Sequence, residues 1–600
     1  MLPIVSSHQS LARALADLAP NSEQSIAAHE KGHCVVLAGP GSGKTKTLTT
    51  AIARALIEDV PEPRGVACIT YNNECAGELE ERLAKLGITS SERCFIGTVH
   101  SFALTQVISP YARCIEGLLP SDYRVATRAQ CRAAVEVAYA EVFGGPDDPH
   151  ARWRFAEEKR RRDVDRSLPA WRDENPELAD FVDAYEAELR REGLIDFDDM
   201  PLIAFRMIRE NQWIRDALRA RYPVLFVDEY QDLGHALHEL VLLLCFHAGI
   251  RLFAVGDADQ SIYSFTGANP QLLLELTARP DVRTVRLRFN YRSGAKIIRA
   301  SLGALGEERD YRGVDGAPEG DLRFRSVPGG LDQQAQLIAK EIVPELLAEG
   351  VPPEQIAVLY RAAWLGDKVA QVLEEAEIPF IRTDANALIK RNSRFARFIE
   401  ACAQWVTGGW READPRYDWL LREACRLVYG GRFSDSEEQE ISRRFIAFLR
   451  SSIDGTDSTH GWLLRFHAEL VSHWMQLCRN VQQEWDECLD LAKRMDPKTG
   501  SDVPLNILSG RIEGCGRVTL SSLHSAKGRE FDAVVLFGMN DGDLPNWRDK
   551  QTPRAMREAR RLFYVGVTRP RRILSVVYQK KNHSPWLLEL YERSRPADEA

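Results

Sequence analysis

Residues 34–45, which read CVVLAGPGSGKT, constrain the fold of this chain more than any other segment. The apolar run predicts a buried strand, the glycines predict a tight turn, and a helix is expected from about residue 44 through 56. The three glycines of the turn let backbone N–H groups point inward at phosphate, while Lys44 can reach the terminal phosphates and the Thr45 hydroxyl can ligate magnesium. The segment therefore predicts a nucleotide phosphate site. We expect it to contain Ala38, Gly39, Pro40, Gly41, Ser42, Gly43, Lys44, Thr45 and Lys46, with Ala38 standing where the general pattern has its first glycine.

A second apolar strand, within residues 222–232 (YPVLFVDEYQD), ends in two adjacent acids. Asp228 would hold magnesium and Glu229 would polarise the attacking water, which is the division of work that phosphoryl transfer requires. The alternative is a solvated acidic turn. Because four apolar residues run directly into the acid pair, the buried end of a strand is the better interpretation.

A third apolar strand, within residues 251–265 (RLFAVGDADQSIYSF), leads to a loop that carries Gln260. The Gln260 amide can both donate and accept hydrogen bonds, which suits contact with a terminal phosphate or its attacking water without adding charge. Three strands that each end in polar residues predict an α/β fold, with a parallel sheet and a ligand at the carboxyl ends of its strands.

The bulk composition limits the class of protein. At 600 residues the chain is too long for one hydrophobic core, so we expect several domains. It has 44% hydrophobic and 28% charged residues and no apolar run near 18 residues, which argues against a membrane partner. The first residues lack the pattern of a secretory signal, so we expect a cytoplasmic protein. The 12 cysteines form no C-x-x-C pair, which favours buried thiols over a metal site. With a net charge of −9, any nucleic-acid path must be local.

Six further motifs occur in order along the chain. They are NSEQ at residues 21–24, ITYNNECAGEL at 69–79, GTVHSFA at 97–103, NYRS at 290–293, LHSAKGREFDAVVLFGM at 523–539 and YVGVTRP at 564–570. Together with the phosphate turn, the acid pair and the glutamine loop, they resemble the motifs of the UvrD/Rep family of superfamily 1 DNA helicases, of the 3′–5′ type. The resemblance covers nearly the whole length of the chain.

The resemblance implies a fold and an ATP site. The expected fold class is α/β, with two RecA-like P-loop motor domains that contain parallel sheets, each interrupted by a mostly helical insertion. In the family, ATP binds with Mg²⁺ between the two motor domains. The matching positions imply that Gln24 contacts adenine, Tyr291 stacks on adenine, Glu530 contacts ribose, and Arg292 and Arg569 contact the γ-phosphate from the second motor domain. We therefore expect Lys44, Glu229, Gln260, Arg292 and Arg569 to support catalysis.

The resemblance also implies a path for single-stranded DNA, because aromatic side chains near loop tips hold single strands by stacking. The residues expected there are Tyr71, Asn72, His100, Tyr263, Phe265 and His524. In many relatives tryptophan and arginine stand at the positions of Phe265 and Thr266, so this chain offers a smaller stacking face and one cation fewer. For any one aromatic residue, a packed core ring is the alternative.

We predict six segments along the chain. The first motor domain occupies residues 1–104 and 200–285 and is interrupted by a helical insertion at 105–199. The second motor domain occupies 286–405 and 516–600 and is interrupted at 406–515 by a second insertion, which is shorter than in the best-known relatives. The second insertion holds 14 Lys and Arg against 18 Asp and Glu, and it is rich in tryptophan. These tryptophans fit core packing, with docking of a protein partner as the alternative.

Residues 151–166 of the first insertion form a basic run, with seven Lys and Arg against four Asp and Glu. Such a run can contact a DNA strand or duplex, or it can be one solvated face of a helix, which is common for charge runs.

The first functional hypothesis is an ATP-dependent helicase that moves 3′ to 5′ on single-stranded DNA and unwinds duplex in repair, replication or recombination. Its partners would be single strands and single-strand/double-strand junctions. The alternatives are a translocase with little unwinding of its own and a nucleotide-gated sensor subunit of an antiphage or repair complex. The motifs alone do not distinguish RNA from DNA, and the resemblance favours DNA.

Overall fold

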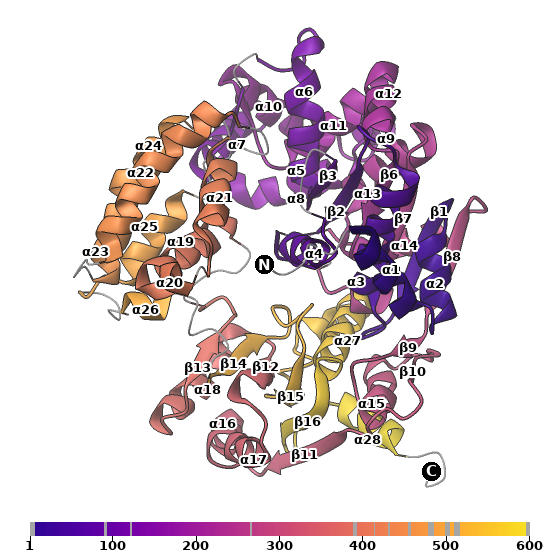
Figure 1. Cartoon of the computed structure of the whole chain (residues 1–600), viewed down its shortest axis with the longest axis vertical. Helices are drawn as coiled ribbons and strands as arrows, with labels where there is room; N and C mark the ends of the chain where they lie inside the picture. The colour runs from indigo at the N-terminus through magenta and orange to yellow at the C-terminus, as the bar shows by residue number, and fades with distance from the viewer. Residues whose placement is uncertain are drawn as a thin grey trace.

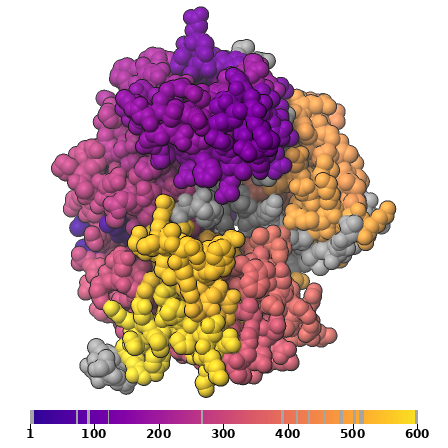
Figure 2. Space-filling view, turned by 180° about the vertical axis from the view of Figure 1, so that it is seen from behind, coloured from indigo at the N-terminus to yellow at the C-terminus, as the bar shows by residue number. Residues whose placement is uncertain are grey.

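The computed structural model describes residues 7–71, 73–88, 93–120, 123–263, 267–387, 393–412, 414–429, 433–453, 458–477, 485–498, 504–508 and 516–595. Two parallel sheets with helices on both faces form the two motor parts, and two helical insertions lie beside them (Figure 1). From behind, the first insertion, in purple, lies above the C-terminal part of the second motor, in yellow, with the orange second insertion at the side (Figure 2). No helix of the described ranges is long and apolar enough to cross a membrane.

The first sheet has six parallel strands in the order β3-β2-β6-β7-β1-β8. Its strands are β1 (His33–Ala38), β2 (Val66–Thr70), β3 (Cys94–Thr98), β6 (Val224–Val227), β7 (Arg251–Gly256) and β8 (Val282–Leu287). One face is covered by α2 (Ser22–His29), α3 (Lys44–Arg54) and α4 (Asn73–Lys85), and the other by α11 (Asp199–Glu210), α13 (His235–Leu242) and α14 (Gln271–Thr277). Since both faces are covered, central strands such as β6 are apolar and buried throughout.

The second sheet also has six parallel strands, in the order β11-β16-β15-β12-β14-β13. Its strands are β11 (Asp321–Val327), β12 (Ile356–Tyr360), β13 (Phe380–Arg382), β14 (Val518–Ser522), β15 (Phe531–Leu536) and β16 (Pro570–Gln579). One face carries α15 (Ala295–Leu305), α27 (Pro553–Val567) and α28 (Trp586–Ser594), and the other carries α16 (Leu331–Leu337), α17 (Val343–Ala348) and α18 (Ala363–Glu375). Two parallel sheets covered by helices confirm the predicted α/β fold class of a two-domain motor.

The first insertion has a core of its own between residues 126 and 194. It is built from α7 (Arg128–Val142), α8 (Pro149–Arg162) and α10 (Pro176–Arg191), with a short parallel pair of β4 (Arg124–Val125) and β5 (Leu194–Ile195) at its base. Val107, Ile108 and Ala112 lie inside the predicted insertion but pack in the core of the first sheet. The separate core therefore begins later along the chain than residue 105.

The second insertion is helical in its described residues and packs around tryptophan side chains. It contains α19 (Arg394–Gln404), α21 (Tyr417–Tyr429), α22 (Asp435–Ile453), α23 (Thr459–Phe466) and α25 (Asp486–Arg494). Trp405, Trp462, Trp474 and Trp485 are buried in this core, which favours the packing interpretation for them, whereas Trp410 and Trp419 are exposed by 40% and 47%. Because α19 packs in the same core, the helical unit starts before residue 406. Likewise β8 runs to Leu287, past the predicted junction at 285.

The basic run of the first insertion is largely neutralised by acids within the same insertion. Six of its seven cations form ion pairs with carboxylates. Arg160 is fully buried and donates to Asp196 at 2.7 and 3.0 Å, to Glu186 at 2.7 Å and to Asp199 at 2.5 Å. This pairing favours a structural role for the run over a DNA contact.

We expect Arg160→Ala to lower the free energy of unfolding by about 3–5 kcal/mol, because it leaves buried carboxylates without their cation. Urea unfolding of the full chain, followed by circular dichroism, measures the change. Arg161→Ala is the matched control. The Arg161 side chain is 44% exposed and pairs with Asp198 and Glu157 near the surface, so its loss should cost no more than about 1 kcal/mol. Equal effects of the two variants would contradict the assigned role of Arg160.

Candidate functional site

The phosphate turn between β1 and α3 has the backbone that its glycines permit. Gly41 and Gly43 have φ angles of 68° and 82°, in the left-handed region that side chains disfavour. The Ser42 hydroxyl donates to the Gly39 carbonyl at 2.7 Å and closes the turn. The helix α3 starts at Lys44, so the turn leads into a helix N-terminus, where backbone N–H groups are available for an anion.

The acid pair follows the carboxyl end of β6, beside the phosphate turn. Glu229 has φ 48° and ψ 45°, a left-handed conformation that costs free energy for a residue with a side chain and is found most often at functional sites. Its carboxylate lies 3.7 Å from Lys44 Nζ and accepts a hydrogen bond from the Gln231 amide. The strained backbone and the lysine contact aim the Glu229 carboxylate at the phosphate turn.

The charges at this end of the sheet depend on one another. Burial, and then the neighbouring Glu229, raise the pKa of Asp228 to about 7. Burial alone would raise the pKa of Glu229 as well, but attraction to Lys44 and then Lys527 outweighs it and lowers that pKa to about 2. Lys44 lowers the pKa of Asp228 in turn, but by less than burial and Glu229 raise it. The Asp228 carboxylate and the Thr45 hydroxyl offer hard oxygen donors, the ligand type that Mg²⁺ prefers.

The N-terminal motif lies against the phosphate turn and the second motor. Asn21 caps α2 by accepting hydrogen bonds from the backbone of Glu23 and Gln24. The Gln24 amide donates to the Ser42 carbonyl at 2.8 Å, so part of its donor capacity is held by the turn itself. The Asn21 amide donates to the Tyr291 hydroxyl at 2.8 Å. The motif thus fixes the position of the tyrosine from the second motor.

The residues that the family places on ATP from the second motor lie close to the turn. The backbone N–H of Tyr291 donates to the Gly41 carbonyl at 2.8 Å, and the Tyr291 side chain is 51% exposed, which leaves ring surface for stacking. Arg292 forms an ion pair with Glu530, which also accepts from Arg571 at 2.7 Å. Arg292 and Glu530 are thus paired with each other, so binding of Arg292 to a γ-phosphate requires it to share or leave this partner.

Arg569 crosses to the first motor. It is only 1% exposed, and its guanidinium donates to the Gln260 side-chain oxygen at 2.9 Å. Gln260 in turn donates to Asp257 at 2.5 Å. Burial, and then repulsion by Arg292, lower the pKa of Arg569 to about 9. In the described part of the chain Arg569 has no carboxylate ion pair, so it is a buried cation available to an anion.

The aromatic candidates for strand binding form a row that crosses between the motors. Tyr71 and Tyr263 stack with ring centres 5.2 Å apart, and Tyr263 lies 6.4 Å from the His524 ring and donates to the His524 carbonyl at 3.3 Å. Lys527 lies 4.9 Å over the Tyr263 ring. Two of the predicted residues, Asn72 and Phe265, lie outside the described residues.

His100 belongs to a separate ring pair. It stacks on Phe197 at 3.8 Å, and Phe197 is 45% exposed. Burial is the main cause that lowers the pKa of His100 and of His524 to about 4, so both rings are neutral at pH 7. They can offer stacking surface and do not add positive charge. The sequence reasoning missed Phe197, although it lies in the segment LIDFDDM that ends the first insertion.

A second contact between the motors was also missed. Lys527 forms an ion pair with Asp232 at 2.5 Å, with both side chains nearly buried. Asp232 ends the segment with the acid pair, and Lys527 lies three residues after His524. Both residues belong to recognised motifs, but a pairing over this sequence distance has no local signal.

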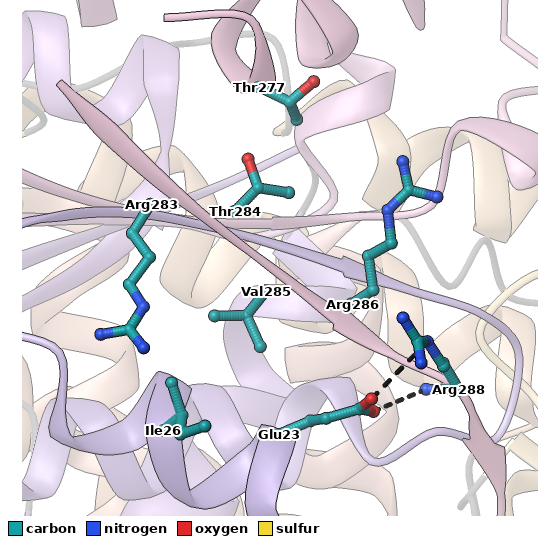
Figure 3. Close-up of a pocket in the computed structure, with 8 residues that line it drawn as sticks. All are labelled: Glu23, Ile26, Thr277, Arg283, Thr284, Val285, Arg286 and Arg288. Carbon is teal, nitrogen blue, oxygen red and sulfur yellow. Dashed lines mark hydrogen bonds and ion pairs between the residues drawn. The ribbon is translucent and has the colours of Figure 1, made fainter. Parts of the chain in front are cut away.

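Two depressions lie near the first sheet. One of about 730 Å³ lies behind the phosphate turn and is lined by residues of both motors, including Ala38, Asp259 and Tyr311. The other, of about 470 Å³, lies at the edge strand β8 and is lined by residues such as Glu23, Ile26 and Arg283 (Figure 3). None of its lining residues belongs to the phosphate turn, so it is not the nucleotide site.

Two covered parallel sheets, a phosphate turn, an acid pair at an adjacent strand and a buried arginine from the facing domain define a P-loop motor that uses a nucleoside triphosphate. Comparison with known proteins agrees. Residues 19–281 match the UvrD/REP helicase N-terminal domain, and residues 506–581 match the UvrD-like helicase C-terminal domain. The chain belongs to the UvrD/Rep family of superfamily 1 helicases and is a DNA helicase.

Similar proteins span most of the chain. The ATP-dependent DNA helicase UvrD2 of Mycobacterium tuberculosis (strain ATCC 25618 / H37Rv) is 28% identical over 580 residues, which cover 90% of this chain and 76% of the relative. UvrD1 of the same strain is 28% identical over 637 residues, with 93% and 82% covered. The helicase Rep of Buchnera aphidicola subsp. Acyrthosiphon pisum is 24% identical over 611 residues, with 91% and 92% covered. These relatives confirm the resemblance drawn from the motifs and indicate that the chain uses ATP and binds DNA.

We expect Glu229→Gln to keep ATP binding and to lose hydrolysis by about 10²- to 10⁴-fold, because the amide fills the same space but cannot act as a base. Nucleotide affinity and ATP turnover are measured on the same preparation. Glu239→Gln on α13, a carboxylate outside the site, should behave like the wild type. Weak ATP binding by Glu229→Gln would indicate a structural role for Glu229.

We expect Arg569→Ala to separate binding from catalysis. The phosphate turn is intact in this variant, so ATP should bind with modest loss, while hydrolysis in the presence of DNA should fall by about 10³- to 10⁵-fold. The exposed neighbour Arg572→Ala serves as the matched control. Normal hydrolysis by Arg569→Ala with DNA would show that closure of the two motors on the γ-phosphate is wrong for this chain.

Proposed function

We propose that the chain hydrolyses ATP to move 3′ to 5′ along single-stranded DNA and unwinds duplex at single-strand/double-strand junctions. The observation that carries the proposal is the hydrogen bond between Arg569 of the second motor and Gln260 of the first. Gln260 lies three residues before Tyr263, which belongs to the aromatic row. The same short loop therefore reaches both the nucleotide end and the strand end, so a change at one end can move the other.

We assign the nucleotide roles as follows. Lys44 and the backbone of residues 38–46 bind the phosphates, Glu229 polarises the attacking water, and Gln260 orients that water. Arg569 and Arg292 balance the charge that develops on the γ-phosphate. On the base and sugar, we propose that Gln24 and Tyr291 contact adenine and that Glu530 contacts ribose.

Thr45 and Asp228 would hold a magnesium ion, which would neutralise charge on the phosphates. When ATP leaves, the negative charge that faces Arg569 is lost and the motors can separate. Repeated closure and opening would move the strand past the aromatic row by small steps. In this proposal Tyr71, Tyr263, His524 and His100 contact the strand, and Asn72 and Phe265 stay sequence-based candidates for the same path.

Other features of the proposal rest on the sequence and the family. The six-segment division is proposed as the domain plan, with the predicted boundaries at residues 105, 285 and 406 moved as the packing described above requires. Cytoplasmic location and work in repair, replication or recombination stay predictions. The second insertion could dock a protein partner through exposed Trp410 and Trp419.

A second candidate function is a translocase, or a nucleotide-gated subunit of a repair or antiphage complex, with little unwinding of its own. It is favoured by the acidic composition of the second insertion, with 14 Lys and Arg against 18 Asp and Glu in residues 406–515. An acidic surface repels the phosphates of a DNA duplex. Unwinding at a junction would then need another surface, of this chain or of a partner, to bind the duplex. Copurification of a partner with the tagged full chain tests this candidate.

The polarity is tested by strand displacement with ATP and Mg²⁺ on matched duplexes that carry a 3′ tail, a 5′ tail or no tail. We expect unwinding of the 3′-tailed duplex only, and no unwinding when Mg²⁺ is chelated. Lys44→Ala is the control, because without the lysine the phosphates lose their cation and turnover should fall by several powers of ten. Unwinding from the 5′ tail alone would refute the polarity, while DNA-stimulated ATP hydrolysis without displacement would favour the translocase.

A duplex with an RNA tail tests whether the chain moves on DNA or on RNA.

A further inference from the structure

A segment of the second motor leaves its own domain and lies on the first motor. Residues 307–313, here called the strap, follow the C-terminal end of α15 and lead into β10 (Arg312–Gly313), which pairs with β9 (Phe289–Asn290). In Figure 1 this short pair lies between α2 of the first motor and α15 of the second. The strap also forms one wall of the 730 Å³ depression behind the phosphate turn.

Arg309 is the strongest contact of the strap with the first motor. Its guanidinium donates two hydrogen bonds to the Asp259 carboxylate, each 2.8 Å long. The Asp259 side chain is 8% exposed and that of Arg309 is 31% exposed, so the pair is largely shielded from water. A bidentate arginine–carboxylate pair fixes both distance and orientation. Glu307, also in the strap, accepts from the same guanidinium at 2.6 Å and holds it in place.

Asp259 belongs to the turn that presents Gln260. The Asp259 backbone N–H donates to the Asp257 carboxylate at 3.1 Å, and the Gln260 amide donates to the same carboxylate at 2.5 Å. The free oxygen of the Gln260 amide then accepts from Arg569 at 2.9 Å. The chain of contacts from Arg309 to Arg569 thus starts and ends in the second motor and passes through one turn of the first.

Two neighbours of Arg309 bind other parts of the nucleotide end. The Tyr311 ring packs on the phosphate turn so closely that a Cβ atom at Gly39 would lie 2.6 Å from it. Asp310 forms an ion pair at 2.8 Å with Arg288, whose backbone N–H and guanidinium also contact Glu23 of α2 (Figure 3). Three successive strap residues therefore contact the glutamine turn, Arg288 directly after β8, and the phosphate turn.

We propose that the strap is a latch between the motors and that Arg309 is a positioning residue for ATP hydrolysis. Through Asp259, Arg309 holds the turn of residues 257–260 so that Gln260 meets Arg569 when the motors are closed. Arg309 does not touch the phosphates. Its loss should therefore change the rate of turnover and leave binding in place. The latch rests on the proposed function and adds to it a contact between the motors that lies outside the nucleotide site.

The test is Arg309→Ala in the full chain. A displaced catalytic group costs on the order of 10- to 100-fold in rate, so we expect kcat for ATP hydrolysis to fall by that factor. The KM for ATP and the Kd for single-stranded DNA should stay close to the wild-type values. The melting temperature should fall, because the largely shielded Asp259 loses its cation, but the protein should stay folded at the assay temperature. Arg309→Lys keeps the charge but not the two parallel hydrogen bonds, and its kcat should lie between those of Arg309→Ala and the wild type.

Arg593→Ala is the matched control. Arg593 on α28 binds Glu308 of the same strap at 2.5 Å, but this contact stays within the second motor, so kcat should not change. A double variant, Arg309→Ala with Asp259→Ala, should be no slower than the slower of the two single variants, because both remove one pair.

Unchanged kcat in Arg309→Ala overturns the latch. The latch is also refuted if the kcat losses of the two single variants multiply in the double variant. It is refuted as well if unfolding at the assay temperature accounts for the lost rate. ATP hydrolysis is measured with and without DNA. If DNA does not stimulate hydrolysis by the wild-type protein, the proposed function is refuted. The latch is then still tested on hydrolysis without DNA.

Discussion

Arg569 is buried and has no carboxylate ion pair within the described ranges, and the rest of the site depends on this constraint. A buried charge is costly unless it is paired or hydrogen-bonded. Among the residues that the structure describes, the guanidinium donates to neutral acceptors, which are the carbonyls of Val565 and Arg529, the Thr568 hydroxyl and the Gln260 amide oxygen, at 2.9 to 3.3 Å. Hydrogen bonds of this kind hold the cation in position without neutralising it. An anion that enters between the motors is therefore attracted by the full charge of the Arg569 guanidinium. Phosphoryl transfer uses this kind of electrostatic preorganisation.

The first motor provides the opposite charge, and the two ends of the site are linked through short loops. Asp228 and Glu229 gather negative charge beside Lys44, where a metal ion is expected to bind, while Arg569 faces them from the second motor. Gln260 connects Arg569 to the loop that carries Tyr263, and Lys527 contacts both Asp232 and the Tyr263 ring. Each of these contacts joins the motors at a point between nucleotide and strand. Movement of one motor relative to the other therefore has to change the nucleotide contacts and the aromatic row together.

The sequence predicted those parts of the structure that local pattern determines. The strand, turn and helix around Lys44, the acid pair after β6 and the loop with Gln260 each have a signal within about a dozen residues, and their order identified the family. Contacts between distant segments had no such signal. The Arg309–Asp259 and Lys527–Asp232 pairs join residues that only the packing of one motor against the other brings together. The predicted domain boundaries were wrong for the same reason. The sequence placed α19 in the second motor, but its apolar face packs in the core of the second insertion.

The charge distribution decides how such a chain can hold a strand. The basic run of the first insertion is neutralised by carboxylates of α10 and of the segment after β5, so it contributes little net field. The second insertion is acidic, and the net charge of the chain is −9. His100 and His524 are neutral at pH 7 because burial lowers their pKa to about 4. Of the strand-binding candidates that the structure describes, those between the motors form a row of uncharged rings with Lys527 over one of them. Stacking depends little on base identity, because every base has a π-face. A strand held mainly by stacking can shift by one base without losing its contacts, which is the property that a stepping motor needs.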